Sequence, residues 1–200
     1  AGEITHMLAD ETAGRLTISD QDITVNNAGT ITVDTANLLM ATTTGVVTAT
    51  IVSTETLTEL GTLTDGVGQT NNLTITIREA DATSGTAADL NAINSVTSIA
   101  VDLTNVTALA ASSLSDLGTL ATAITNNEFD NDTGITTIAV SDATIDATTL
   151  AARIDSFDTI NGGSTTGMTL AAGATINVDA DEVAHLLADE TANRLTISDQ

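Results

Sequence analysis

The chain is 200 residues long, 42% hydrophobic and 1% aromatic, and it contains no Cys, Pro or Trp. Its 27 acidic residues and four arginines give a net charge of −23, which excludes a nucleic-acid backbone and an anionic membrane surface as partners. The apolar content is high enough for a folded core, and no stretch approaches the roughly 18 apolar residues of a membrane span.

Seven short helical segments are predicted, with apolar residues at helical spacing behind a polar start. They begin near Glu3, Asp34, Thr54, Thr86, Ser112, Asp146 and Asp179. Three of the starts place an N-cap acceptor three residues before an acid, at Thr86/Asp89, Ser113/Asp116 and Asp179/Glu182. Helices this short are unstable alone, so each needs a neighbour that covers its apolar face.

Between the helices, aliphatic residues alternate with Thr, Ser, Ala or Asp, which is typical of strands with one buried face. The alternating sets are Leu16/Ile18, Ile23/Val25, Ile31/Val33, Leu73/Ile75/Ile77, Ile99/Val101/Leu103, Ile138/Val140 and Ile176/Val178. Glycines mark corners between them, and the glycine-rich residues 162–167 are expected to form a longer corner.

A segment near the start of the chain recurs near its end. Residues 1–21 repeat as residues 180–200, and residues 3–21 and 182–200 differ only at Ile4/Val183, Thr5/Ala184, Met7/Leu186 and Gly14/Asn193. Gly and Asn best tolerate positive φ, so we expect a left-handed residue to end both helices. We interpret the chain as a window of a longer tandem array with a period of about 179 residues, the offset between residues 3 and 182.

Units of helix and strand that recur every 20 to 35 residues or so are typical of solenoids. We therefore predict an α/β solenoid of repeated helix–strand(–strand) coils with stacked parallel β-strands, continuous over residues 1–200. A doubly wound domain is the alternative, but the sequence has no phosphate-binding loop and its units are self-similar.

The densest polar cluster lies at residues 126–134, with the sequence NNEFDNDTG. Asp130 and Asp132 alternate ahead of Gly134, as in part of a calcium loop in which hard oxygen ligands converge on one ion. We name Glu128, Asp130 and Asp132 as candidate calcium ligands, with an acidic solvated loop as the alternative. Neither the EF-hand spacing nor glycine-rich calcium nonapeptides occur in the sequence.

His6 and His185 occupy the same repeat position, and each precedes an Asp by four residues. On a helix this spacing favours pairing of the imidazole with the carboxylate, so we expect a structural role. The only cations are Arg15, Arg78, Arg153 and Arg194, and we expect them to bridge carboxylates within or between coils.

No motif of an enzyme class occurs: the sequence lacks G-x-S-x-G, a Walker loop, a dinucleotide fingerprint and H-E-x-x-H. A glycosidase cleft built on paired carboxylates would have only Phe129 and Phe157 as aromatic platforms, so we predict that the chain is not an enzyme. T-x-T pairs such as Thr48/Thr50 and Thr74/Thr76 leave an ice-ordering threonine face as a minor alternative.

Phrases such as SGTAADLNAI at residues 84–93, followed by VTSIAVD at residues 96–102, resemble the repeats of giant, acidic, Ala/Thr/Asp-rich secreted surface proteins of marine bacteria and cyanobacteria. These proteins are often found beside haemolysin-type calcium-binding proteins. The resemblance implies an extracellular or cell-surface location and a calcium dependence. The chain departs from those neighbours in lacking their glycine-rich nonapeptides.

Taken together, the patterns favour a mechanical function, as part of a filament, sheath, surface layer or cell-surface appendage. The expected partners are copies of the chain itself, because exposed strand edges and threonine faces can pair once charge is screened. The alternative is a monomeric adhesin stalk that presents a distal binding domain.

Overall fold

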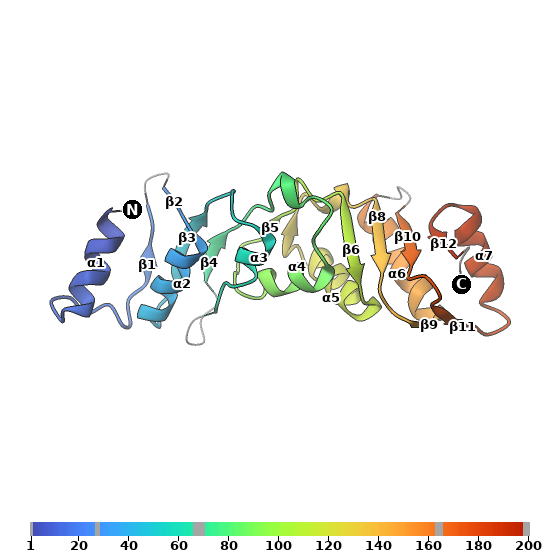
Figure 1. Cartoon of the computed structure of the whole chain (residues 1–200), viewed down its shortest axis with the longest axis horizontal. Helices are drawn as coiled ribbons and strands as arrows, with labels where there is room; N and C mark the ends of the chain where they lie inside the picture. The colour runs from blue at the N-terminus through green and yellow to red at the C-terminus, as the bar shows by residue number, and fades with distance from the viewer. Residues whose placement is uncertain (1, 27–28, 66–70, 163–165, 198–200) are drawn as a thin grey trace. The chain divides into compact units, whose positions relative to one another are not determined.

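A computed structural model describes residues 2–26, 29–65, 71–162 and 166–197 and has a mixed α/β structure (Figure 1). The chain divides into two compact units, which we describe separately. Unit 1 comprises residues 1–78 and 92–101, and unit 2 comprises residues 79–91 and 102–200. Parallel strands and helices that alternate along the chain occur in both, which confirms the predicted α/β class with parallel strands.

All seven predicted helices are present in the described residues. They are α1 (Gly2–Thr12), α2 (Val33–Thr42), α3 (Leu57–Leu60), α4 (Ala87–Asn94), α5 (Leu114–Thr125), α6 (Ala147–Ile160) and α7 (Val183–Thr191), with short 3-10 turns η1 (Glu79–Asp81) and η2 (Asp132–Gly134). Thr86/Asp89 and Ser113/Asp116 cap α4 and α5 as predicted. Asp179 does not cap α7: Glu182 is its N-cap, and the carboxylate of Glu182 accepts the N–H of Asp179 at 3.1 Å.

The twelve strands of the described residues are short. They are β1 (Ile23–Thr24), β2 (Thr30–Ile31), β3 (Val47–Ile51), β4 (Asn72–Thr74), β5 (Val101–Asp102), β6 (Ala108–Ser112), β7 (Phe129–Asp130), β8 (Thr137–Val140), β9 (Thr144–Asp146), β10 (Gly167–Leu170), β11 (Thr175–Asn177) and β12 (Leu195–Thr196). The predicted strand at Leu16/Ile18 is not formed, and Val33 begins α2 instead of ending a strand. Of the predicted corner at residues 162–167, residues 163–165 lie outside the described part, and Gly167 opens β10.

In unit 1, β3 is the centre of a parallel sheet. It pairs with β1 and β2 along one edge and with β4 along the other, where Thr48 stands in register with Asn72. Inward-facing aliphatic residues such as Val47 and Leu73 are fully buried. Thr30, Thr50 and Thr74 stand in register on neighbouring strands, and all three are exposed.

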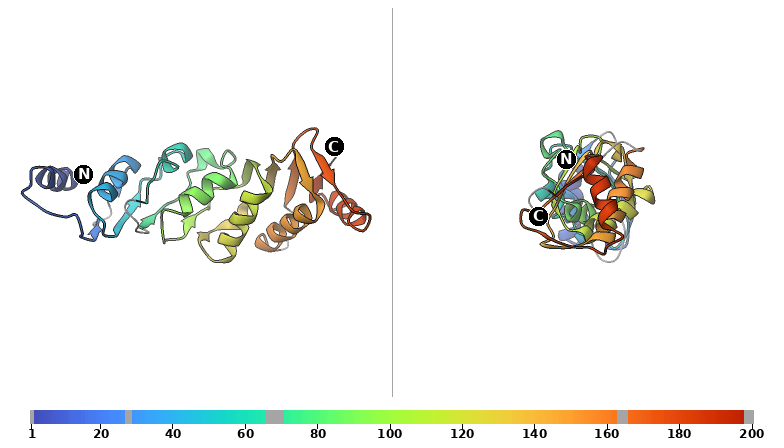
Figure 2. Two further views of the ribbon diagram at one scale, coloured as in Figure 1. Left: turned by 90° about the horizontal axis from the view of Figure 1, so that it is seen from below. Right: turned by 90° about the vertical axis from the view of Figure 1, so that its right-hand side faces the viewer.

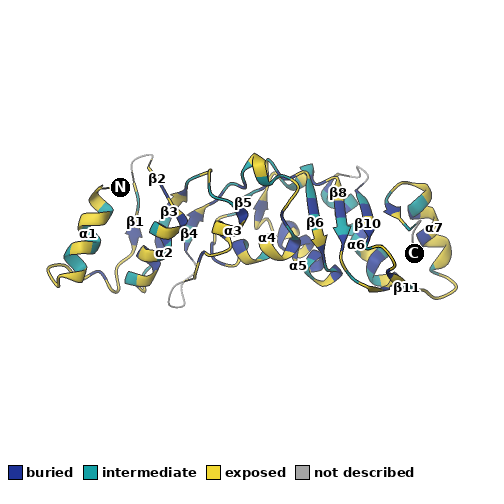
Figure 3. Ribbon diagram, viewed as in Figure 1, coloured by how far each residue is buried: buried dark blue, intermediate teal, exposed yellow. Residues whose placement is uncertain are grey.

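Unit 2 contains a four-stranded parallel sheet in the order β12-β10-β8-β6 and a smaller pair, β11-β9. One buried row crosses the larger sheet in register: Leu109, Ile138, Met168 and Leu195, each at most 2% exposed. Helices α5 and α6 lie side by side on one side of this sheet (Figure 2). Their inward faces are buried, including Leu117 and Phe157 (Figure 3).

Buried polar side chains join each strand segment to the backbone of the segment before it. In unit 1, the Thr43 hydroxyl donates to the carbonyl of Gln21 at 2.6 Å. The Asn71 carbonyl oxygen accepts the N–H of Val47, and the Thr97 hydroxyl accepts the N–H of Leu73, both at 2.9 Å. A buried hydroxyl or amide is stable only when it is hydrogen-bonded, so these bonds fix the register of neighbouring segments.

Acidic side chains also bond to the backbone of the preceding segment, at the N-terminal ends of helices. Glu55 accepts the N–H of Val33 at the start of α2 at 3.1 Å. In unit 2, Asp142 accepts the N–H of Leu114 at the start of α5 at 2.7 Å. A carboxylate at a helix N-terminus satisfies an otherwise unbonded N–H and complements the helix dipole. Some of the many acidic residues therefore cap the helix of the segment that precedes them in the chain.

Candidate functional site

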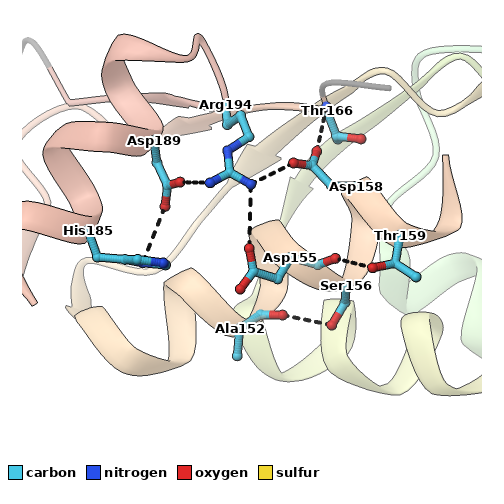
Figure 4. Close-up of polar contacts among 9 residues, drawn as sticks. All are labelled: Ala152, Asp155, Ser156, Asp158, Thr159, Thr166, His185, Asp189 and Arg194. Atoms are coloured by element: carbon cyan, nitrogen blue, oxygen red, sulfur yellow. Dashed lines mark hydrogen bonds and ion pairs between the residues drawn. The ribbon is translucent and has the colours of Figure 1, made fainter. Parts of the chain in front are cut away.

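Within the described part of the chain, Arg194 in unit 2, at the second copy of the repeat, forms ion pairs with three carboxylates. We call residues 3–21 copy 1 and residues 182–200 copy 2. Arg194 follows α7 and faces α6, which supplies Asp155 and Asp158 (Figure 4). Copy 2 itself supplies Asp189, whose side chain is fully buried. One guanidinium thus joins a repeat to the helix that precedes it.

The guanidinium of Arg194 contacts three carboxylates. Its Nη1 lies 2.8 Å from an oxygen of Asp158 and 3.5 Å from one of Asp155, and its Nη2 is hydrogen-bonded to Asp189. The hydrogen bond to Asp158 is the main cause that raises the pKa of Arg194, and the charge of Asp189 acts in the same direction. An arginine held in this way is a permanent cation that neutralises a buried carboxylate.

The carboxylates of Asp158 and Asp189 differ in their other hydrogen bonds. Asp158 accepts the N–H of the buried Thr166 at 2.9 Å, which ties α6 to the start of β10. The second oxygen of Asp189 accepts no hydrogen bond from the described residues, and His185 Nδ1 lies 3.8 Å from it. The repeat histidine of copy 2 therefore lies beside the aspartate one turn later, and their pairing stays a prediction.

Copy 1 has the same residues without this environment. Arg15 pairs with Asp10, and its Nε donates to the carboxylate at 3.0 Å. The side chains of Arg15 and Asp10 are 65% and 45% exposed, whereas those of Arg194 and Asp189 are 25% and 0% exposed. No residue of α1 is buried, and much of its surface is exposed (Figure 3). Among the described residues, copy 2 is seated against α6, and copy 1 has no helix before it.

The leucine that follows the arginine also differs in burial between the two copies. Leu195 is 2% exposed and lies in β12, which pairs with β10. Its counterpart Leu16 is 40% exposed and lies outside any strand. We call the side of the repeat that carries this aspartate, arginine and leucine its leading side. The leading side is buried in copy 2 and uncovered in copy 1.

The opposite side of the repeat, which we call its trailing side, is covered in copy 1. Ile18 is 6% exposed there, and the carbonyl of Ser19 accepts the N–H of Thr44 at 2.8 Å. Gly45 packs so closely that an added Cβ would lie 2.3 Å from the carbonyl oxygen of Gln21. In copy 2, Ile197, the counterpart of Ile18, is only half-buried. The two copies therefore display the two interfaces of one repeat.

The candidate calcium ligands lie in the short strand β7 and next to it. Glu128 precedes it, Asp130 ends it and Asp132 opens η2. Burial raises the pKa of the Asp132 carboxyl, and the negative charge of Asp130 acts in the same direction. Within the described part of the chain, no three His, Cys, Asp or Glu side chains are grouped closely enough to hold a metal ion. Calcium binding by these residues stays a prediction.

The remaining arginines have structural contacts within one unit. Arg153, on α6, lies across Gly118 of α5, and its Nε donates to the carbonyl of Leu114 at 3.2 Å. Arg78 donates to the carbonyl of Thr54 at 3.2 Å. A side chain at position 118 would occupy the space of the Arg153 guanidinium, so this glycine leaves room for that guanidinium on α5. In these two contacts the arginine donates a hydrogen bond to a backbone carbonyl.

The sequence predicted that arginines bridge segments, but it did not identify Asp155 and Asp158 as the partners of Arg194. Those two residues lie 39 and 36 positions before it. Their spacing of three on α6 places them on one face, which is a detectable signal once α6 is known to precede the repeat.

Among the described residues, no helix has the length and apolar character needed to cross a membrane. Comparisons of the chain with protein-family models, with curated proteins and with solved structures found no match.

Proposed function

We propose that the chain is a structural repeat segment of a giant extracellular bacterial protein, which forms a filament, sheath, surface layer or cell-surface appendage. The observation that carries the proposal is that copy 2 packs through its leading side on α6 and β10, whereas copy 1 packs through its trailing side on Thr44 and Gly45. A segment that fits both the end of one period and the start of the next is what an array needs to continue. The function is then mechanical, and the chain uses no catalytic site.

The pairing pattern supports a solenoid within this proposal. In unit 1, β1 pairs with β3 and β3 pairs with β4, and every one of these pairs is parallel. In unit 2, β6 pairs with β8 and β8 pairs with β10, again in parallel. Regular parallel pairing between consecutive segments is the pattern of a coil that stacks on the previous coil. In such an array stability is the sum of coil and interface terms, so the array can lengthen without a larger core.

The charge of the chain supports an ion-rich extracellular setting. A net charge of −23 makes neighbouring copies repel one another unless salt or divalent cations screen it. We include calcium in the proposal for this reason, with Glu128, Asp130 and Asp132 as the residues to test. The resemblance to giant secreted surface proteins points to the same setting.

Electron microscopy of proteins that contain one, two and three periods tests the proposal, in millimolar calcium and with a chelator. We expect rods whose length increases in proportion to the number of periods and which associate laterally when calcium is present. Compact particles whose dimensions do not follow the number of periods would contradict the mechanical array. Single rods in both conditions would leave the adhesin stalk, because a stalk keeps its distal domain away from the cell without self-association.

A second candidate function, ordering of water at an ice surface, has one observation in its favour. Thr30, Thr50 and Thr74 form an exposed row in register, with strands spaced by about 4.8 Å as in any sheet. The parallel row that begins at Thr24 and Thr48 ends in Asn72, which limits the regular surface. Thermal hysteresis that disappears in Thr50→Leu would favour this function over the mechanical one.

A further inference from the structure

We propose that the pair Asn161 and Gly162 is a deamidation site, which is protected in the folded chain and reacts when the C-terminal end of α6 opens. The pair directly follows α6, and it is the single Asn-Gly sequence in the chain. The reaction converts Asn161 to aspartate or isoaspartate. The proposal goes beyond the mechanical function and does not rest on it, because it concerns one side chain inside unit 2.

The two neighbouring residues supply both reacting groups. The backbone N of Gly162 gives up its proton and attacks Cγ of Asn161, the bond between Cγ and Nδ2 breaks, and Nδ2 leaves as ammonia with that proton. The product is a five-membered succinimide, which water hydrolyses at one carbonyl to aspartate and at the other to isoaspartate. Because glycine has no Cβ, no side chain hinders the approach of its N to Cγ.

In the folded chain both reacting groups are held by hydrogen bonds. Asn161 is 6% exposed, and its Nδ2 donates to the carbonyl of Ile135 and to the hydroxyl of Thr166. The N–H of Gly162 donates to the carbonyl of Thr159 at 3.1 Å. Ring closure requires the Gly162 N to turn toward Cγ and Nδ2 to leave its two acceptors, so these bonds must break first. The reaction therefore follows local opening of this end of α6.

The same contacts make the opening irreversible after the reaction. Oδ1 of Asn161 accepts no hydrogen bond from the described residues, so the side chain is held there through Nδ2, the atom that deamidation removes. In aspartate this atom is replaced by a carboxylate oxygen, which cannot donate to the carbonyl of Ile135. A carboxylate that faces a carbonyl at a buried position is a costly unpaired charge. The modified chain therefore does not regain the native contact.

Each residue of the pair has a structural purpose. Asn161 bonds to the backbone of a segment 26 residues earlier, as the buried Asn71 does in unit 1 at a separation of 24 residues. Gly162 has a φ of +64°, a conformation that favours glycine after a helix. The fold therefore places a reactive pair where the chain needs an amide and then a glycine, and its hydrogen bonds protect the pair from reaction.

Peptide mass spectrometry of the whole chain tests the proposal after incubation at neutral pH, folded or unfolded in guanidinium chloride. Trypsin cleaves after Arg153 and Arg194 and releases residues 154–194. Replacement of –NH2 by –OH raises the mass of this peptide, and fragmentation locates the modified residue. We expect deamidation at Asn161 to be at least about tenfold slower in the folded chain than in the unfolded chain. In the unfolded chain Gly162→Ala should slow it, because the added methyl group hinders the attacking N.

Two matched variants show whether the protection is local. Thr166→Val removes one acceptor of Asn161 Nδ2 at a fully buried position. Thr97→Val removes a buried hydroxyl of unit 1, which accepts the N–H of Leu73. We expect Thr166→Val to accelerate deamidation at Asn161 in the folded chain by about fivefold or more, as for the loss of one hydrogen bond. Thr97→Val should leave the rate unchanged.

The variant Asn161→Asp places the product in the chain from the start. The amide of Gly167 donates to the carbonyl of Thr136 at 2.9 Å, and these residues directly follow the two acceptors of Asn161. We expect hydrogen exchange of this amide to be at least about tenfold faster in Asn161→Asp than in the native chain. Exchange as slow as in the native chain would contradict the irreversible step.

Three results would overturn the proposal. The first is deamidation of Asn161 at the same rate in the folded and unfolded chains. The second is equal acceleration by Thr166→Val and Thr97→Val, which would indicate global unfolding in place of local opening. The third is a rate in the unfolded chain that Gly162→Ala does not lower, because Gly162 would then not supply the attacking N.

Discussion

Copy 1 and copy 2 have nearly the same sequence in two environments. Asp189 and Leu195 are buried, whereas Asp10 and Leu16 at the same repeat positions are about half exposed. Because local sequence is almost constant, the difference arises from the neighbour: copy 2 has α6 and β10 beside it, and copy 1 has no such partner among the described residues of unit 1. The repeat therefore encodes an interface, and a strand forms at Leu195–Thr196 only where that interface is occupied.

The difference in environment between the two copies is tested by removing the arginine from each copy in turn. Arg194→Ala leaves the fully buried Asp189 without its cation, which should cost about 3 kcal/mol, at the low end for a broken buried pair. Arg15→Ala removes an exposed pair and should cost less than about 1 kcal/mol. Amide hydrogen exchange in α7 and α1 measures the two local effects. Equal losses in both helices would contradict the difference in environment.

The trailing side of copy 1 can be tested through Gly45. In Gly45→Ala the new Cβ would meet the backbone of Gln21 and Asp22, which cannot rotate away. We expect unit 1 to lose about 2 kcal/mol, as for an overpacked core, measured by urea unfolding. Gly29→Ala is the control, because a Cβ there meets nothing within 4 Å. A change at Gly45 no larger than that at Gly29 would show that the trailing contact is loose.

The seat of copy 2 can be weakened through the cap of α6. Asp146 accepts hydrogen bonds from the hydroxyl and N–H of Thr149, which lower the pKa of its carboxyl. The resulting stability is fully present above the ordinary pKa of 3.8 and is lost as the pH falls through the lowered pKa. The stability difference between the native chain and Asp146→Ser, a cap that does not titrate, should therefore shrink in acid. A difference that stays constant from neutral pH to about pH 2 would contradict this role.

The smallest effect on stability is expected at a position where the two copies differ in sequence, Gly14 in copy 1 and Asn193 in copy 2. Gly14 and Asn193 both have positive φ, at +67° and +59°. Gly14→Asn should change the local stability of copy 1 by less than about 0.5 kcal/mol, whereas Gly14→Ala should cost about 1 kcal/mol because alanine is strained in this conformation. Exchange of the Arg15 and Leu16 amides, which donate to the carbonyl of Asp10, measures both. Equal costs for Asn and Ala would contradict the conformational reason for the swap.

Local signals in the sequence predicted the helices and the left-handed residues. Thr86/Asp89 and Ser113/Asp116 are reciprocal caps, and the Gly14/Asn193 swap identified a positive φ that is present in both copies. These features depend on a few adjacent residues, so no knowledge of tertiary contacts is needed. The residues that determine these features lie within about one helical turn of one another.

The features that the sequence did not predict depend on neighbours. The predicted strands did not include β6 or β10, whose sequences ALAAS and GMTL have little β-propensity, although both strands pair with β8. Likewise, nothing local to Arg194 indicates Asp158 as its partner. That the whole chain forms one continuous solenoid stays a prediction, because the evidence from burial and register lies within each unit.

Hydrogen exchange of a two-period protein, residues 1–200 followed by residues 22–200, tests the central claim most directly. Its internal repeat has α6 and β10 before it and the equivalents of Thr44 and Gly45 after it. We predict that the amides of this internal repeat are protected at least as strongly as those of copy 2 in the single-period chain. Exchange of the internal repeat as fast as copy 1 of the single-period chain would contradict the claim that this segment is an interface with two sides.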